Sequence, residues 1–222
     1  MALTHDPSMS IDLAPSVDGD FVTVLIGKNE RKFFIHEAPL RAHSRFFDAA
    51  MSGAWKESAH RILKLPVEQE APFKIYIRWV YTNKTSFAES CASRDFAELY
   101  IMASRLQDGE CQGAAIDCII RRTQTKQKVP NEHTVNMIYS NTLAGDPARR
   151  LCIDCWVIHG SERWFENPAG AIDAQFYKDV AKLFCSKRNG KELPNRLYDE
   201  HGSTCRYHQH GEGECYGKKY AS

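Results

Sequence analysis

Four residues near the C-terminal end of the chain have side chains that bind metal ions. They lie within a polar, glycine-rich stretch, residues 201–220, and they are Cys205, His208, His210 and Cys215. Thiolate sulfur and imidazole nitrogen are ligands that zinc prefers, and four of them complete a structural zinc site. The stretch has no apolar stripe to fold on, so a bound zinc ion would supply the folding free energy that it lacks.

The alternative for this stretch is a disordered tail, because its composition is polar and glycine-rich. The spacing Cys-x-x-His-x-His also lacks the paired Cys-x-x-Cys and His-x-x-x-His rhythm of recognisable zinc fingers. The sequence therefore favours a disordered tail, and a zinc site is the competing interpretation.

A second group of candidate ligands lies on a predicted helix after Asp146. Cys152 and Cys155 are followed by His159 one turn later, so the three could form a metal or redox site. A structural zinc site needs four ligands, and redox-active Cys-x-x-Cys pairs usually begin a helix, whereas this pair lies in the middle of one. The sequence favours simple packing of both thiols in the apolar stripe of the helix.

The elements that position these residues begin with two strands. In residues 21–26 apolar side chains occupy both faces, which predicts a buried strand, and Arg31 to Ile35 returns as the second arm of a hairpin. Ser44 is placed to cap a helix that contains Phe47. A third short strand covers residues 62–65.

The helix predicted for residues 70–81 is apolar on nearly all of its faces. A helix of this kind belongs in the middle of a domain, and it is too short for a membrane span. We therefore expect Trp79 of this helix, together with Phe47, in the core.

This order of elements resembles the BTB/POZ domain, over roughly the first half of the chain. The residues that carry the resemblance are Asp20, His36, Leu40, Ser44, Phe46, Phe47, Trp55, Glu57, Ser58, Tyr81 and Thr82. The family has glycine after Tyr-Thr, where this chain has Asn83, a residue that tolerates the left-handed conformation. The chain resembles short fungal members in particular, because Cys-x-Tyr-His-x-His tails similar to residues 205–210 occur among them.

The resemblance implies an α/β (α+β) domain in which a small sheet is flanked by helices. It also implies a non-enzymatic protein-protein interaction adaptor that pairs with itself or hands substrates to a cullin-based ubiquitin ligase. Tyr81 lies where family members tend to meet a cullin, so it is the candidate partner-binding residue. We identify no catalytic residue, because the sequence has no phosphate loop, nucleophile elbow or His-Glu-x-x-His motif.

The predicted organisation has four parts. A flexible N-terminal tail precedes the BTB/POZ-like domain, a helical extension follows a polar, proline-ended linker, and a polar Cys- and His-containing tail ends the chain. Their bounds are 1–17, 18–122, 123–190 and 191–222. Many self-associating members of the family exchange an N-terminal strand and helix between two copies. Residues 1–17 are too short for such a helix and are broken by Pro15, so their deletion should leave the association state unchanged.

Composition limits the remaining function classes. The 222 residues carry a net charge of +1, which gives no global attraction to nucleic acid or anionic lipid. No segment has the length of a membrane helix or the pattern of a signal peptide, so we expect an intracellular protein of the nucleus or cytoplasm whose eight cysteines are reduced. Apart from zinc, no cofactor is expected. The alternative function is a small zinc-binding regulatory protein, or a transcription-associated one that uses the basic residues around Lys126 and Lys128.

Overall fold

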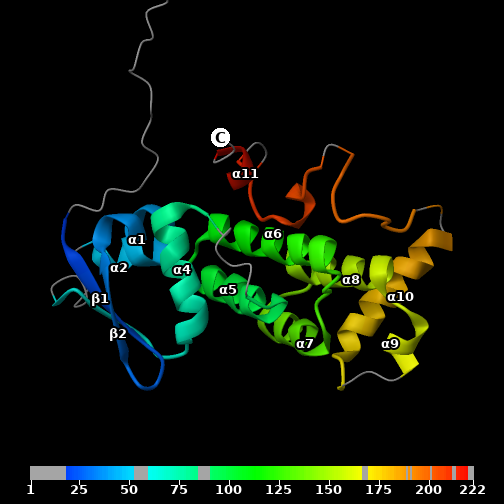
Figure 1. The fold of residues 1–222 in the computed structure, drawn as a ribbon, viewed down its shortest axis with the longest axis horizontal. Coiled ribbons are helices and arrows are strands. Elements are labelled where there is room, and N and C mark those ends of the chain that lie inside the picture. The colour runs from blue at the N-terminus through cyan, green and yellow to red at the C-terminus, as the bar shows by residue number, and fades with distance from the viewer. Residues whose placement is uncertain are drawn as a thin grey trace, which may run out of the picture.

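The computed structural model describes residues 19–52, 60–84, 91–166, 170–188, 190, 192–200, 202–211 and 214–219. Within these ranges a small sheet lies at one end of the molecule and helices form the rest (Figure 1). This architecture confirms the predicted mixed α/β fold class. The predictions for residues 1–17 and the family positions Trp55, Glu57 and Ser58 lie outside the described residues.

The sheet has three strands in the order β2-β1-β3, with bounds β1 Phe21–Ile26, β2 Arg31–His36 and β3 Ile62–Leu65. Strands β1 and β2 form the predicted antiparallel hairpin, and β3 pairs parallel with β1. Val22 and Val24 are fully buried under the helices, whereas Phe21 on the opposite face is 53% exposed. The prediction that both faces of β1 are buried is therefore wrong at Phe21, because the described helices cover one face of the sheet (Figure 1).

Three helices pack next to the sheet, with bounds α1 Glu37–His43, α2 Arg45–Met51 and α4 Glu70–Thr82. Trp79 and Phe47 are both fully buried, which confirms their predicted place in the core. Ser44 caps α2 as predicted, since its hydroxyl oxygen accepts the Phe47 N–H at 3.1 Å. Asn83 ends α4 with φ of 51°, the left-handed conformation that its family position requires.

Two long helices form the middle of the molecule, with bounds α5 Ser93–Arg105 and α6 Gly109–Lys126. Asp95 is the third residue of α5, and its carboxylate accepts the Ala92 N–H at 2.6 Å. The predicted domain end at Arg122 falls inside α6. The helix continues because Thr123 is buried, and its hydroxyl donates to the Ile119 carbonyl at 3.0 Å.

The helical extension continues the same core, with bounds α7 Glu132–Asn141, α8 Pro147–His159, α9 Glu162–Glu166 and α10 Ala174–Arg188. Asp146 begins α8 as predicted, because its carboxylate accepts the Ala148 N–H at 2.8 Å and Pro147 holds the first helical position. None of the described helices is long and apolar enough to span a membrane.

The C-terminal tail differs from the flexible segment that we expected. It runs back from α10 past α8 and over α6, and it contains the short helices η2 (Cys205–Tyr207) and α11 (Tyr216–Lys219) (Figure 1). Leu197 and Tyr207 are at most 2% exposed. These apolar side chains, placed far apart in a polar stretch, pack the described part of the tail against the helices.

Candidate metal centre

The first anchor of the tail is Tyr207, which fills a site beside helix α8. Its hydroxyl donates to Oδ2 of Asp154 at 2.7 Å, and Arg206 pairs with the same oxygen at 3.1 Å. The guanidinium of Arg206 also lies 4.7 Å from the centre of the Tyr207 ring. Because Tyr207 is fixed in this way, its neighbours Cys205 and His208 are held above α6.

The second anchor is Tyr216, which begins α11. Its hydroxyl donates to Oδ2 of Asp117, a residue of α6, and its ring lies against Gly113 one helical turn earlier. Thr204 donates to the other carboxylate oxygen of Asp117 at 2.5 Å. Asp117 therefore receives a hydrogen bond from each end of the tail segment that carries the candidate ligands.

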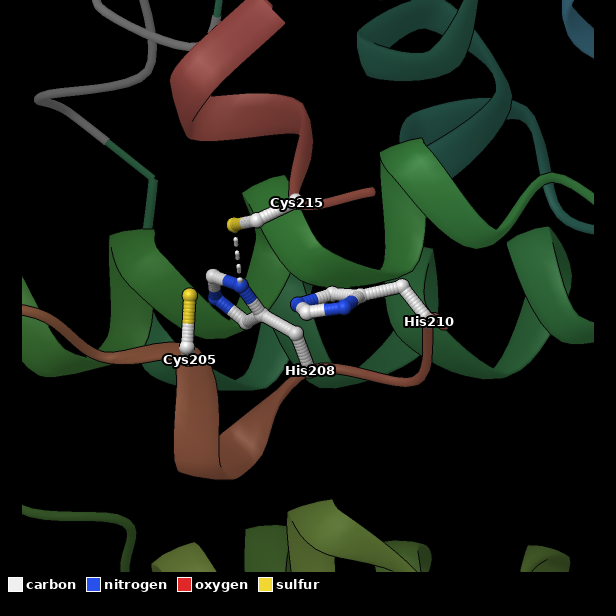
Figure 2. A group of neighbouring side chains, drawn as sticks. All are labelled: Cys205, His208, His210 and Cys215. Atoms are coloured by element: carbon white, nitrogen blue, oxygen red, sulfur yellow. Dashed lines mark hydrogen bonds between the residues drawn. The ribbon is translucent and has the colours of Figure 1, made fainter. Parts of the chain in front are cut away.

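Between the two anchors the four predicted ligands converge, and Figure 2 shows their side chains gathered in front of α6. We call Cys205, His208, His210 and Cys215 the Cys/His cluster. Their possible ligand atoms all lie within 4.8 Å of one another. The His208 side chain is 3% exposed and Cys215 is buried, whereas His210 lies at the surface. Nδ1 of His208 lies 3.3 Å from Sγ of Cys215.

Each histidine of the cluster has one ring nitrogen engaged outside the cluster. Nε2 of His208 lies 3.0 Å from Oδ1 of Asp117, and Nδ1 of His210 lies 2.7 Å from the carbonyl oxygen of Gly211. A carbonyl can only accept, so Nδ1 of His210 carries the proton. In the neutral rings, Nδ1 of His208 and Nε2 of His210 are then left with lone pairs.

Burial and hydrogen bonds shift the pKa values of the acid and of both thiols. Burial raises the pKa of Asp117, but the hydrogen bonds that the carboxylate accepts outweigh burial and hold this pKa below its ordinary value. Partial burial likewise raises the pKa of Cys205, but polar contacts that include Cys215 and His210 outweigh it and lower this pKa. Burial raises the pKa of Cys215. The cluster thus combines two imidazoles, two thiols, of which Cys205 has a lowered pKa, and a nearby carboxylate, which together suit a cation.

The domain on which this tail rests has a recognisable family. A family model of the BTB/POZ domain matches residues 16–118. The chain contains a BTB/POZ domain. A comparison with curated proteins finds no match. The BTB domain is a protein-protein interaction domain, and its matched part extends from β1 into α6 and includes Asp117. The tail is therefore docked on the last helix of the BTB domain.

Tyr81, the predicted partner-binding residue, lies in the last turn of α4. Its hydroxyl accepts the His36 N–H at 3.0 Å and lies 2.8 Å from His36 Nδ1. This pair joins the end of α4 to the junction of β2 and α1 within the BTB domain. The hydroxyl is occupied by these contacts, so the half-exposed ring is the part of Tyr81 that could meet a partner.

The second group of candidate ligands does not come together. Cys152 and Cys155 are fully buried in the core, and burial raises the pKa of both thiols. His159 is exposed at the end of α8. The two cysteines therefore pack as small apolar side chains, as the sequence favours.

A groove of about 1000 Å³ lies between the BTB domain and the tail. Arg41 and Arg45 line it from α1 and α2, and Asp108 lines it from the turn before α6. His210 and Tyr216 line it from the tail. The docked tail therefore forms part of the surface that the BTB domain presents.

The sequence predicts the four cluster residues but not Asp117 of α6, which holds His208 in place. His208 and Asp117 are 91 positions apart, so no local spacing connects them. One signal was available, since Asp117 interrupts an otherwise apolar run at residues 113–120. A carboxylate in such a run needs a polar partner, because charged groups are rarely buried unpaired.

Proposed function

We propose that the chain is a non-enzymatic adaptor that binds other proteins through its BTB domain. The observation that carries this proposal is the family match over residues 16–118, because BTB domains are interaction modules. The partner that we propose is a second copy of the chain or a cullin of a ubiquitin ligase. Cys111, Cys152 and Cys155 pack in the core as thiols, which supports a reducing compartment, the nucleus or the cytoplasm.

The C-terminal end of α4 is the surface that we propose for a cullin. Tyr81 matches the family position that tends to meet a cullin, and Thr82 and Lys84 beside it are exposed. The hydrogen bonds between Tyr81 and His36 keep this end of the helix in place against the sheet. An exposed charge at such a contact affects association more than it affects folding.

Charge reversal at Lys84 tests this surface. Lys84→Glu should weaken binding of a purified cullin, measured by titration calorimetry, while the free energy of unfolding changes by less than about 0.5 kcal/mol. The matched control is Lys178→Glu, since Lys178 is exposed on α10 in the helical extension. If Lys84→Glu and Lys178→Glu bind the cullin equally well, the proposal that the cullin binds at the end of α4 is wrong. If the parent chain neither binds a cullin nor self-associates in sedimentation, the proposed partners are wrong.

A second candidate function is a zinc-binding regulatory role in which the tail is the working part. The convergence of the Cys/His cluster favours it. The two functions differ in what Cys205→Ser should do to the full chain. An adaptor that works through its BTB domain keeps its protein partner, whereas a chain that works through its tail loses it.

A further inference from the structure

We infer that Cys205, His208, His210 and Cys215 bind one structural zinc ion, which fastens the tail to helix α6 of the BTB domain. Two sulfur and two imidazole ligands make a donor set that suits zinc and that magnesium and calcium avoid. Four protein ligands leave no position for water or substrate, so the site is structural. Tyr216 beside the site packs on Trp79 of α4, with ring centroids 5.9 Å apart. The four ligands themselves do not include Tyr81, Thr82 or Lys84, the residues of α4 and its end that we propose for a protein partner.

The spacing of the ligand atoms is close to that of a tetrahedral zinc site. Zinc bonds of about 2.0–2.3 Å place tetrahedral ligand atoms roughly 3.3–3.8 Å apart. The cluster atoms lie within 4.8 Å of one another, and the pair formed by His208 Nδ1 and Cys215 Sγ is already at 3.3 Å. Zinc binding would have to bring the other ligand atoms closer together. The side chains that would move are those of Cys205 and His210, which are less buried than Cys215.

The groups around the cluster orient both imidazoles as metal sites require. Zinc-bound histidines nearly always donate their other ring N–H to a carboxylate or a backbone carbonyl. His208 has the carboxylate of Asp117 at 3.0 Å, and His210 has the carbonyl of Gly211 at 2.7 Å. These contacts use Nε2 of His208 and Nδ1 of His210, so the other nitrogen of each ring is left for the metal ion. Asp117 of α6 supplies this partner for the buried His208, and the backbone of Gly211 supplies it for His210.

The position of the site explains what the ion would do. Cys205 begins η2 and Cys215 directly precedes α11, so one ion would join the two ends of the docked segment. Asp117 then connects that ion, through His208, to the last helix of the BTB domain. Two thiolates balance the charge of the ion, since a coordinating thiol loses its proton. Zinc binding therefore supplies folding free energy to a segment whose described part has few buried apolar residues.

The metal content of the untagged full-length chain tests the inference. Protein purified without added metal should hold about one zinc per chain by elemental analysis. Cys205→Ser should lose the zinc, whereas Cys185→Ser, which changes an exposed cysteine of α10, should keep it. Asp117→Asn keeps all four ligands and should lower zinc affinity about 10- to 100-fold in a chelator competition.

Two further measurements use the parent chain, so they test the inference even if a variant folds poorly. Cobalt(II) added to the metal-free parent should give the visible absorption of a tetrahedral thiolate site. Removing zinc with a chelator should raise hydrogen exchange in residues 202–211 and 214–219, while the sheet and α4 keep their protection.

Three outcomes would overturn the inference. One is a parent chain without bound metal that also fails to bind cobalt. Another is a Cys205→Ser/Cys215→Ser double variant that keeps its zinc. The third is a metal-free parent with a disulfide between Cys205 and Cys215, detected as a mass loss that reduction restores. None of these outcomes depends on partner binding, so the adaptor proposal can succeed or fail separately.

Discussion

The ring of Tyr216 packs on Gly113 so closely that a Cβ atom at Gly113 would lie 2.9 Å from ring carbons Cδ1 and Cε1. The same Cβ atom would lie 3.5 Å from Cγ of His208. Gly113 is in the interior of α6, where glycine costs about 1 kcal/mol of helix stability relative to alanine. The docked tail accounts for a glycine at this position.

Gly113→Ala should therefore weaken the docking of the tail on α6 and leave the rest of the fold intact. The new methyl group favours α6 but displaces the aromatic ring, so residues 214–219 should become more sensitive to proteolysis. Global unfolding should change by less than about 1 kcal/mol. Gly109→Ala is the control, because a Cβ atom there would meet its nearest neighbour at an ordinary 3.6 Å. Equal tail proteolysis in the two variants would contradict the close packing of Tyr216 on Gly113.

Ser44 makes two hydrogen bonds that Ser44→Ala would remove together. Its hydroxyl accepts the Phe47 N–H at 3.1 Å and donates to the Leu106 carbonyl at 2.5 Å, in a fully buried position. Loss of the cap and of the hydrogen bond to the Leu106 carbonyl, which keeps only the 3.4 Å bond from the Phe46 N–H, should lower the free energy of unfolding by about 2 kcal/mol, measured in urea. Ser52→Ala, at the exposed end of the same helix, should cost less than about 0.5 kcal/mol. Similar costs for the two serines would show that Ser44 does not couple α2 to α5.

The features that sequence analysis predicted correctly are those that depend on neighbours in the chain. The cap at Ser44, the start signal at Asp146 and the apolar faces around Trp79 each need only a few adjacent residues. The contact between Asp117 and His208 joins positions 91 residues apart, and no local pattern encodes it. The docking of the tail was missed for the same reason, because Tyr207 and Tyr216 find their sites on distant helices.

Asp108 should make stability depend on pH. It caps α6 and accepts the Trp79 Nε1–H at 3.2 Å, but it is 1% exposed, and burial raises its pKa from 3.8 to about 7. The unfolded carboxyl therefore ionises first as the pH rises. The free energy of unfolding should therefore fall by up to about 4 kcal/mol as the pH rises from about 4 to 7. Above about pH 7 the contribution of Asp108 should no longer change with pH.

Asp108→Asn measures this contribution, because the side chain no longer ionises and its amide oxygen can still accept the Cys111 N–H. The amide NH2 takes the place of Oδ2, so the bond from the Trp79 Nε1–H is lost at every pH and does not affect how the stability difference changes with pH. Urea denaturation of both proteins at several pH values between 4 and 8 gives the difference directly. The parent should lose stability relative to Asp108→Asn as the pH rises. Parallel curves for the two proteins would mean that the folded carboxyl ionises near its ordinary pKa.

Truncation of Phe47 or Trp79, the predicted core side chains, should cost a free energy close to the whole stability of a small domain. Phe47 and Trp79 are fully buried, so Phe47→Ala and Trp79→Ala should each cost about 3–5 kcal/mol in thermal or urea unfolding. Trp79→Ala also removes the donor to Asp108, so it should show the larger loss at pH 8. Melting of Trp79→Ala within a degree or two of the parent would contradict its place in the core.

Tyr81→Phe distinguishes the structural role of Tyr81 from its proposed role in binding. The substitution removes the hydroxyl that accepts the His36 N–H at 3.0 Å and contacts Nδ1 at 2.8 Å, and it keeps the aromatic ring. The free energy of unfolding should fall by about 1–2 kcal/mol, because the His36 groups lose a partner in a half-buried site. Cullin binding by the folded variant should stay within twofold of the parent, because the half-exposed ring that we propose for the contact is unchanged. A large loss of binding without loss of stability would assign the hydroxyl to the partner, and the pair with His36 would then be dispensable for the fold.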